Sequence, residues 1–358
     1  MAAPRCTTAA GGKVRVLIVD DSLVIRHLLR EALSADPAIE VVGAEANGVA
    51  ALERIPQLKP DLVTLDIEMP QMDGLETLRR IRKNFPKLRT VMFSTLTTRG
   101  ASATFEALSL GADDYVAKVS NVGKLDQSLA NLRSELIPKI RQFFSIPGKP
   151  AVSSQPPPVS PARPVLKKKA RVLVIGVSTG GPNALVQLIP ALPATFPLPV
   201  LVVQHMPPTF TRLLAERLDS LSALTVREAD DHMEAKPGNV ILARGDYHLT
   251  VRKAGSTAFV HVDQGPPENS CRPAADVLFR SAVKAYEGAV LSVVLTGMGV
   301  DGRRGTEEVK AAGGFSIAQD QATSVVWGMP GAVVEAGLAD EVLPLADVAP
   351  ELVRLAER

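Results

Sequence analysis

Cysteine and aromatic residues are scarce in this chain of 358 residues, which has two cysteines and 4% aromatic residues. The disulfide framework of a small secreted scaffold is therefore excluded. We expect Cys6 to lie in an N-terminal tail and Cys271 in a loop, without a disulfide between them. Four of the five histidines show no metal-ligand spacing with the cysteines, so surface or structural roles are expected for His27, His232, His248 and His261.

Long hydrophobic runs are also missing. The longest apolar stretches, such as Val200 to Val203 and Ala289 to Leu295, are far shorter than the roughly 20 residues that a membrane-spanning helix needs. The N-terminal residues 1 to 12 hold no apolar run that could act as a secretory signal, so we expect them to form a disordered tail. These absences predict a cytoplasmic protein with no segment inserted in a membrane.

A large excess of charge of one sign is the third absence, because the formal net charge is +2. Basic residues do gather between positions 143 and 169, where seven prolines and five Lys or Arg occur without an acidic residue. This segment is interpreted as a linker. The alternative is a nucleic-acid-binding arm, but such binding normally places basic residues on the face of a folded module, so no nucleic-acid partner is predicted.

What the sequence does have is an ordinary globular composition, with 46% hydrophobic and 22% charged residues. Its length suggests about two domains. With the tail and linker assigned, the first domain is predicted over residues 13 to 142 and the second over residues 170 to 358.

Short β-branched runs alternate with amphipathic helical patterns in both domains. The first domain has five candidate strands: Val14 to Val19, Ile39 to Gly43, Leu62 to Leu65, Thr90 to Phe93 and Asp114 to Ala117. The second has five more: Arg171 to Ile175, Val200 to Val203, Val240 to Leu242, Ala289 to Leu295 and Phe315 to Ala318. Alternation of this kind predicts two α/β domains, a five-stranded doubly wound sheet followed by a second, mostly parallel one.

Charged and hydroxyl side chains stand at the ends of the strands in the first domain. Asp20 and Asp21 follow the first strand, Asp66 the third, Ser94 the fourth and Lys118 the fifth. The carboxyl ends of parallel strands meet at one edge, where carboxylates repel one another unless a cation compensates. Asp21 and Asp66 therefore make a candidate Mg²⁺ site. The alternative is that the acidic pair and Ser22 only cap the next helix.

Residues 13 to 140 resemble a response-regulator receiver domain, on the run Asp66 to Pro70 together with the acidic pair and the lysine. The resemblance implies a flavodoxin-like fold and phosphorylation of Asp66 by a histidine kinase. It further implies Mg²⁺ held by Asp20, Asp21, Asp66 and the backbone of Glu68, and a switch formed by Ser94, Tyr115 and Lys118. Val119 stands where the family usually has proline, a departure that bears on the family's cis peptide and on how Lys118 is presented.

In the second domain, Gly176 to Gly181 follows an apolar strand and leads into a helix, with Ser178 between glycines. A serine on such a strand-turn-helix elbow is typical of hydrolases. Two alternatives are a helix N-cap serine and a phosphate-cradling loop of a dinucleotide or nucleotide site. The second alternative is weak, because Ser178 replaces the middle glycine of the dinucleotide motif and no Gly-Lys-Ser/Thr occurs.

Two further strand ends favour the hydrolase interpretation. Gln204 to Pro208 follows one strand with His205, and Thr296 to Gly302 follows another with Asp301. Taken alone, the histidine would be read as structural and the aspartate as a helix cap. Together with Ser178 they supply the nucleophile, base and orienting acid of acyl transfer.

These motifs and the segment His261 to Pro267, found within about residues 170 to 345, resemble the chemotaxis protein-glutamate methylesterase family. The order of the two domains matches its regulated members. The resemblance implies hydrolysis of glutamyl methyl esters, and deamidation of selected glutamines, on chemoreceptors. It implies Ser178, His205 and Asp301 as the catalytic triad, oxyanion donors near Thr179 and Met298, and no cofactor for the esterase. We expect the unphosphorylated first domain to block the second, a coupling that phosphorylation would weaken. The rival functions are a response regulator whose output domain only binds a partner, and a regulated dinucleotide-binding enzyme.

Overall fold

The computed structural model describes residues 12–95, 97–118, 125–144 and 168–357, without the side chains of 125–128 and 131. Its contacts divide the chain into two compact units, with the division between Ala151 and Val152. Most of the predicted tail and linker lies outside the described residues, as do Cys6 and Val119. The exact domain limits therefore stay predictions, and each unit is described by itself.

The first unit holds a five-stranded parallel sheet with the strand order β2-β1-β3-β4-β5. Its strands are β1 (Val14–Val19), β2 (Ile39–Glu45), β3 (Leu62–Asp66), β4 (Arg89–Ser94) and β5 (Asp114–Ala117). The strands in the middle of the sheet are covered on both faces and are almost continuously apolar, as buried parallel strands are. The order reverses between β1 and β3, which places a crevice at their carboxyl ends.

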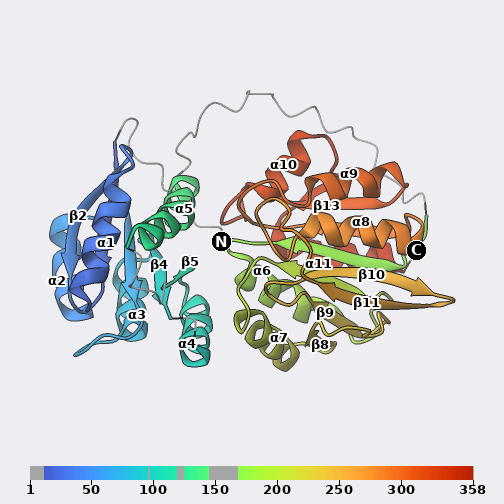
Figure 1. The fold of residues 1–358 in the computed structure, drawn as a ribbon, viewed down its shortest axis with the longest axis horizontal. Helices are drawn as coiled ribbons and strands as arrows, with labels where there is room; N and C mark the ends of the chain where they lie inside the picture. The colour runs from blue at the N-terminus through green and yellow to red at the C-terminus, as the bar shows by residue number, and fades with distance from the viewer. Residues whose placement is uncertain (1–11, 96, 119–124, 145–167, 358) are drawn as a thin grey trace. The chain divides into compact units, whose positions relative to one another are not determined.

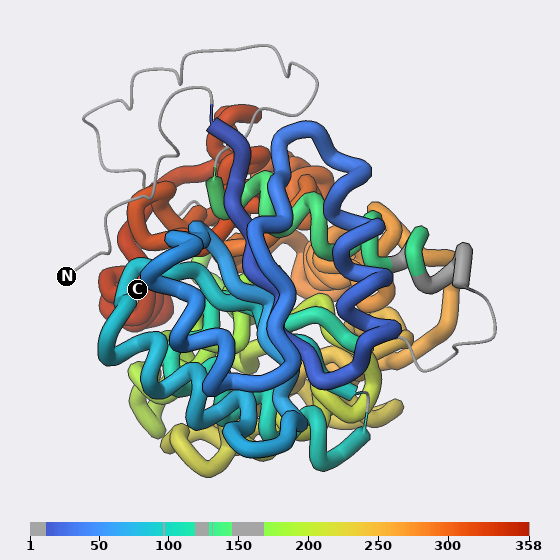
Figure 2. The backbone as a smooth tube through the Cα atoms, turned by 90° about the vertical axis from the view of Figure 1, so that its left-hand side faces the viewer, coloured from blue at the N-terminus to red at the C-terminus, as the bar shows by residue number. Residues whose placement is uncertain are grey.

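Five helices cover this sheet: α1 (Leu23–Ser34), α2 (Gly48–Leu58), α3 (Gly74–Asn84), α4 (Thr98–Ser109) and α5 (Leu125–Phe143). Helices α1 and α5 lie side by side, as Figures 1 and 2 show. The predicted apolar stripe of α1 is buried at Leu28, Leu29, Ala32 and Leu33. Ser22 is the N-cap of α1, and its hydroxyl accepts the Ile25 N–H at 3.4 Å.

The second unit holds a seven-stranded sheet with the order β14-β13-β12-β6-β7-β9-β8, and every neighbouring pair of strands is parallel. Its strands are β6 (Val172–Val177), β7 (Val200–Gln204), β8 (Thr225–Glu228), β9 (Asn239–Leu242), β12 (Val290–Val294), β13 (Phe315–Gln319) and β14 (Glu341–Leu343). The strand order reverses beside β6, because the chain moves from β6 to β7 on one side and later returns to β12 on the other. This reversal marks the carboxyl ends of β6, β7 and β12 as the place for a ligand.

Helices cover both faces of the second sheet (Figure 1). One face carries α6 (Gly181–Leu188), the 3₁₀ turn η1 (Ile189–Ala191), α7 (Phe210–Leu221) and α11 (Leu345–Ala356). The other carries α8 (Ala275–Tyr286), α9 (Arg303–Ala311) and α10 (Met329–Glu335). The predicted fold class, two α/β units with doubly wound sheets, is thus confirmed.

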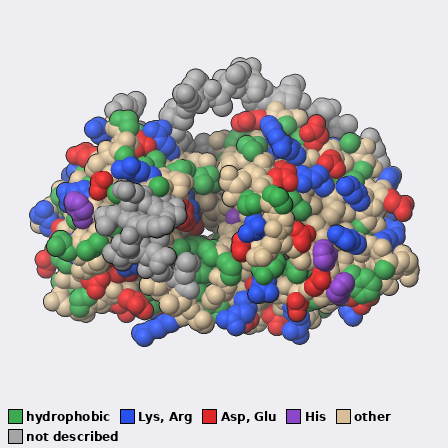
Figure 3. Space-filling model, viewed as in Figure 1, with side chains coloured by type: hydrophobic (Ala, Val, Ile, Leu, Met, Phe, Trp, Pro, Cys, Tyr) green, Lys and Arg blue, Asp and Glu red, His purple; other side chains and the backbone are tan. Residues whose placement is uncertain are grey.

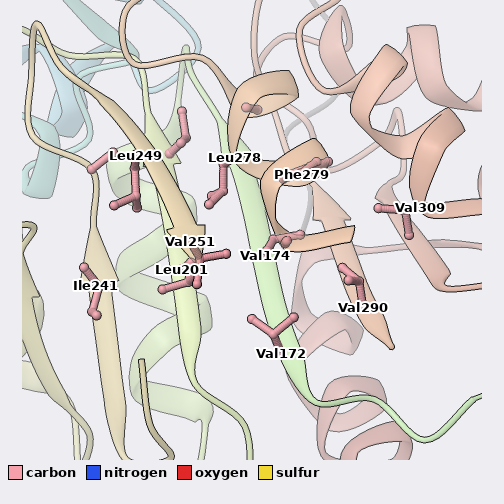
Figure 4. Packing of buried hydrophobic residues seen from close by; sticks show 14 of the residues in the cluster. Val172, Val174, Leu201, Ile241, Leu249, Val251, Leu278, Phe279, Val290 and Val309 are labelled. Carbon is pink, nitrogen blue, oxygen red and sulfur yellow. The ribbon is translucent and has the colours of Figure 1, made fainter. Parts of the chain in front are cut away.

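Four strands of the second unit were not predicted: β8, β14 and an antiparallel hairpin formed by β10 (His248–Ala254) and β11 (Thr257–Asp263). The hairpin is not part of the large sheet but packs against α8. Figure 4 shows its residues Leu249 and Val251 facing Leu278 of α8 and Leu201 of β7. This cluster gives the second unit one continuous core that reaches from the sheet to the hairpin.

On the face that Figure 3 shows, acidic and basic side chains are interspersed over the described surface. No helix among residues 12–95, 97–118, 125–144 and 168–357 is both long and apolar enough to cross a membrane.

Candidate active site and phosphoacceptor site

Asp66 lies at the carboxyl end of β3 and faces Asp20, which follows β1. The Lys118 Nζ reaches both carboxylates, at 2.9 Å from Asp20 Oδ2 and 2.7 Å from Asp66 Oδ2. Asp20 and Asp66 are buried, whereas Asp21 is exposed. The predicted convergence of these strand ends therefore occurs. Capping contacts are present as well, because Ser22 caps α1 and Asp20 Oδ1 accepts the Ser22 N–H at 2.9 Å.

The carboxylates of this cluster outnumber its one lysine, so an additional cation would balance their charge. Burial raises the pKa of Asp66 to about 6, the Asp20 charge adds to the rise, and Lys118 opposes it. One lysine thus faces the carboxylates of Asp20, Asp21 and Asp66, whose nearest oxygens all lie within 4.8 Å of one another. Carboxylate oxygens are the ligands that Mg²⁺ prefers, so these residues fit the predicted ion. For Glu68 the structure records a backbone N–H 3.4 Å from Asp66 Oδ1.

The predicted switch residues of this unit are placed as follows. Ser94 ends β4, and its hydroxyl donates to the Gly100 carbonyl at 2.8 Å. Tyr115 is buried within β5, and burial raises the pKa of its phenol well above 10. The hydroxyl of Ser94 is thus bonded toward α4 rather than toward Asp66 in this structure.

Ser178 follows β6 at the sharp turn into α6. The turn depends on Gly180, which has φ of +75°, a conformation that costs glycine little. Gly297 approaches from the loop after β12, where a Cβ atom would lie 2.8 Å from the Ser178 Cβ. Ser178 itself is half-buried, with its N–H bonded to Thr296 O at 3.0 Å. The elbow is therefore held by direct contact with a neighbouring strand end.

His205 follows β7, the strand that pairs with β6 through Val177 and Gln204. Its backbone N–H bonds Val177 O at 3.2 Å, so Ser178 and His205 leave neighbouring strands side by side. The imidazole Nε2 lies 2.8 Å from Asp301 Oδ2. Its other nitrogen, Nδ1, lies 3.7 Å from Cys271 Sγ. Asp301 therefore occupies Nε2, and Nδ1, which contacts Cys271 in this structure, is the ring nitrogen left to act on a substrate proton.

Asp301 is 2% exposed and accepts three backbone N–H bonds in addition to the contact with His205. Its Oδ2 accepts the Ala275 N–H at 2.6 Å, and its Oδ1 accepts the N–H groups of Asp276 and Gly302, each at 3.0 Å. Two of these donors are the first residues of α8, a helix whose own N-cap residue provides no side-chain bond. Asp301 therefore accepts the first N–H groups of α8, as a helix cap does, and also contacts the imidazole of His205.

Burial alone would favour the neutral forms of both partners, but their hydrogen bond opposes this. For His205, burial lowers the pKa, while the contacts with Asp301 and Cys271 raise it, with a net rise above 6.5. For Asp301, burial raises the pKa, while His205 and the N–H donors of α8 bring it down to about 2. Both shifts favour an imidazolium-carboxylate pair, the state that forms when His205 accepts a proton.

The structure brings together two of the three predicted catalytic residues by a hydrogen bond. Within the described ranges, no hydrogen bond joins the Ser178 hydroxyl to His205. The backbone N–H groups of Thr179 and Met298, the predicted oxyanion donors, make no hydrogen bond within the same part of the chain. These two N–H groups therefore have no acceptor in the described part of the protein.

Sequence reasoning assigned no role to three residues that contact this site. Gln204 Nε2 donates to Ser178 O at 3.0 Å, and Thr296 Oγ1 donates to Thr179 O at 2.9 Å. Asn269 Nδ2 donates to Asp301 Oδ1 at 2.8 Å. Gln204 and Thr296 stand in the quoted strand-end motifs, a signal that could have identified them, whereas Asn269 lies in a loop between β11 and α8.

The remaining histidines have no common metal site in the described residues. His27 and His232 are exposed, His248 is buried and bonds Pro266 O at 3.0 Å, and His261 bonds Asp231 at 2.6 Å. Asp20, Asp21 and Asp66 form the one group with metal-ligand geometry in the ranges that the structure covers.

Comparison with known proteins gives two family matches. Residues 173–352 match the CheB methylesterase model, and residues 16–130 match the response regulator receiver domain model. A "Protein-glutamate methylesterase/protein-glutamine glutaminase" of Nocardioides sp. is 53% identical over 349 residues, covering 95% of each chain. A protein of the same name from Trichodesmium erythraeum is 48% identical over 347 residues, covering 96% of this chain and 99% of that one.

A solved structure supports the same likeness. The CheB methylesterase catalytic domain of Thermotoga maritima is 48% identical, with a TM-score of 0.51. It covers 52% of this chain and 98% of that domain.

Proposed function

The chain belongs to the protein-glutamate methylesterase/protein-glutamine glutaminase family, and from this premise we propose that Ser178, His205 and Asp301 hydrolyse glutamyl methyl esters on chemoreceptors. The observation that carries the proposal is the His205–Asp301 hydrogen bond of 2.8 Å, formed where Ser178 leaves the neighbouring strand. The protein would act in the cytoplasm.

In the proposed reaction His205 removes the proton of the Ser178 hydroxyl as the oxygen attacks the ester carbonyl. Because Asp301 holds Nε2, the proton goes to Nδ1, and the serine hydroxyl must approach this nitrogen in the substrate complex. Such contacts are often long in enzymes without substrate and shorten on binding. His205 then protonates the departing methoxide, and methanol leaves.

The acyl-enzyme is next attacked by water, which gives up a proton to His205. The bond from the acyl carbon to the Ser178 oxygen then breaks, His205 returns the proton to that oxygen, and the free glutamate side chain is released. Deamidation of a glutamine would follow the same path with ammonia as the leaving group. The unbonded N–H groups of Thr179 and Met298 would stabilise the oxyanion of both tetrahedral intermediates. Acylation and deacylation, as proposed, use only these residues and water.

Replacement of the nucleophile tests this proposal. Ser178→Ala should lower methanol release from methylated receptor membranes by about 10⁴-fold or more, because loss of one triad member disables the triad. His205→Gln should have a similar effect, and both proteins should remain folded by circular dichroism. Release near the parent rate in either folded variant would remove that residue from the mechanism.

A serine-directed phosphonate separates the esterase from its rivals. It should label Ser178 covalently, because an activated hydroxyl attacks phosphorus. A partner-binding output unit or a dinucleotide-binding enzyme has no need of such a hydroxyl and should remain unlabelled.

The first unit is proposed to regulate the esterase by phosphorylation of Asp66, with a chemotaxis histidine kinase as donor. Mg²⁺ held by Asp20, Asp21, Asp66 and the Glu68 backbone would neutralise charge on the incoming phosphoryl group. Lys118, already within 2.7 Å of Asp66, would neutralise part of the charge that remains on the product. Ser94 would have to leave the Gly100 carbonyl to donate to a phosphoryl oxygen.

Methanol release by the full chain, measured with and without a small phosphodonor, tests this regulation. We expect faster release with the donor and Mg²⁺, and no change in Asp66→Asn, which cannot form the acyl phosphate. Equal stimulation of the parent and Asp66→Asn would place the effect elsewhere.

A further inference from the structure

A short turn stands over the Asp301 side of the active site. Glu268 and Cys271 pair through two backbone hydrogen bonds of 3.1 and 2.8 Å, with Asn269 and Ser270 at the tip. Both tip residues have positive φ, +52° and +61°. Asparagine tolerates this backbone conformation better than most side chains do. The turn therefore places Asn269 at its tip in a backbone conformation that asparagine tolerates.

The Asn269 residue is exposed, yet its amide nitrogen is directed inward. Its Nδ2 lies 2.9 Å from Asp276 Oδ2 and 2.8 Å from Asp301 Oδ1. An amide nitrogen has two protons, so each carboxylate can receive one. A single side chain thus bridges two buried acids.

The bridged acids are buried, and few cations among the described residues contact them directly. Asp276 is 0% exposed and Asp301 is 2% exposed. His205 is the one ion-pair partner of Asp301, and none exists for Asp276, in the part of the chain that the structure describes. The remaining donors are backbone N–H groups, among them Gly305 to Asp276 Oδ1 at 2.6 Å. Two carboxylates this close repel one another strongly when buried.

We propose that Asn269 is a positioning residue, whose amide holds Asp276 and Asp301 together as anions and keeps Asp301 oriented toward His205. The proposal rests on the proposed esterase function of Ser178, His205 and Asp301. Asn269 acts through Asp301 and is not assigned a contact with the reacting atoms.

The charged groups that face this pair come from four elements. His205 contacts Asp301 from the end of β7, and Arg280 of α8 forms a two-bond ion pair with Glu268 of the turn. Arg304 of α9 also acts on Glu268. Burial raises the pKa of Asp276, the charge of Asp301 adds to the rise, and the bonds from Gly305 and Asn269 oppose it.

Loss of the Asn269 amide should therefore shift the pH dependence of methanol release toward higher pH. Asn269 stabilises the anionic cluster of Asp276, Asp301 and neutral His205, the state required for attack by Ser178. Without the Asn269 amide, the cluster of Asp276, Asp301 and His205 loses the proton that must leave before Ser178 can attack only at a higher pH. The acid limb of the activity profile should move upward, a result that mere loosening of the loop would not produce.

The experiment measures kcat, KM and the pH profile of methanol release for the full chain. Asn269→Ala should lower kcat by about 10- to 100-fold with KM nearly unchanged, the size of effect seen when a reacting group is misplaced. Its acid limb should shift upward by about one pH unit, equivalent to 1.36 kcal/mol. Asn269→Ser, which keeps one donor, should fall between this variant and the parent.

Two further variants complete the test. The double variant Asn269→Ala/Asp276→Asn removes one of the repelling charges and should recover much of the lost kcat and return the limb toward its parent position. Ser270→Ala changes the neighbouring tip residue, whose hydroxyl makes no hydrogen bond within the described ranges, and should behave like the parent.

The proposal would be overturned if kcat and the pH–activity profile of Asn269→Ala matched those of Ser270→Ala. It would also be overturned if Asn269→Ala lost kcat without a shift of the acid limb of its pH–activity profile, and if the double variant did not recover that kcat. If Asn269→Ala does not fold, Asn269→Ser and the double variant decide by the same criteria. Ser178→Ala in the same assay keeps the two proposals apart. Activity in that variant removes the esterase mechanism, whereas its inactivity beside an unaffected Asn269→Ala removes only the role of Asn269.

Discussion

The carboxylate of Asp301 accepts bonds from the first turn of α8 and from the imidazole of His205. Sequence reasoning placed Asp301 at a strand end beside Ser178 and His205, and it weighed a capping role separately. It could not show that both roles fall to one carboxylate, because the donors Ala275 and Asp276 begin a helix whose start the sequence did not fix. Asn269 was missed for a similar reason, since its contacts depend on the backbone of a turn.

Asp66 carries a prediction at the scale of single residues. Its pKa is about 6 in the folded protein, against 3.8 in the unfolded chain, so the folded state disfavours the charged form. The resulting penalty is complete above pH 6 and disappears as the pH falls toward 3.8. Asp66→Asn should therefore stabilise the first unit at pH 8 by on the order of 1–3 kcal/mol, and by less at pH 5.

Unfolding by urea at the two pH values, followed by circular dichroism, measures this difference. The matched control is Asp21→Asn, which removes an exposed carboxylate from the same cluster and should change stability little at either pH. Equal stabilisation by Asp66→Asn at pH 5 and pH 8 would contradict the assigned origin of the penalty.

At the scale of elements, prediction succeeded where the chain follows a simple alternation. The five strands of the first unit and the five predicted in the second all appear within a few residues of their expected bounds. The β10–β11 hairpin was missed because it interrupts the βα alternation, and its polar residues, such as Thr250 and Arg252, weaken the apolar signal. Strands β8 and β14 are short edge strands of four and three residues, which leave little periodicity to detect.

The turn from Glu268 to Cys271 leads to another prediction. Cys271 is half-buried, and its Sγ lies 3.7 Å from His205 Nδ1. When iodoacetamide alkylates this thiol, sulfur displaces iodide and an amide group is added beside the imidazole. The added bulk should displace His205 and lower methanol release by at least about 10-fold.

Cys271→Ser serves as the control for alkylation elsewhere, because it retains Cys6. Its activity with iodoacetamide should equal its own activity without the reagent. Complete modification of Cys271 by mass spectrometry, with an unchanged rate in the parent protein, would contradict the prediction.

At the scale of the whole molecule, the second unit depends on the core that joins α8 to the sheet and to the hairpin. Phe279 is fully buried there, as Figure 4 shows. Phe279→Ala should lower the free energy of unfolding of this unit by about 3–5 kcal/mol, through lost burial and the cavity left behind.

Trp327 is the only tryptophan of the chain and belongs to the second unit, so its fluorescence reports the unfolding of that unit. The urea midpoint of Phe279→Ala should fall while the slope stays the same. Val300→Ala, at an exposed position, is the matched control and should leave the midpoint nearly unchanged. A urea midpoint for Phe279→Ala equal to that of Val300→Ala would contradict the prediction, because the core would then fill the cavity with no loss in the free energy of unfolding.

The position of α8 has a consequence for how the enzyme fails when heated. Its first two N–H groups hold Asp301, and its middle residues Leu278 and Phe279 lie in the core. Fraying of that single helix would release the acid before the sheet comes apart, so thermal inactivation should precede global melting. Selection for heat tolerance and selection for turnover would then act on the same dozen residues.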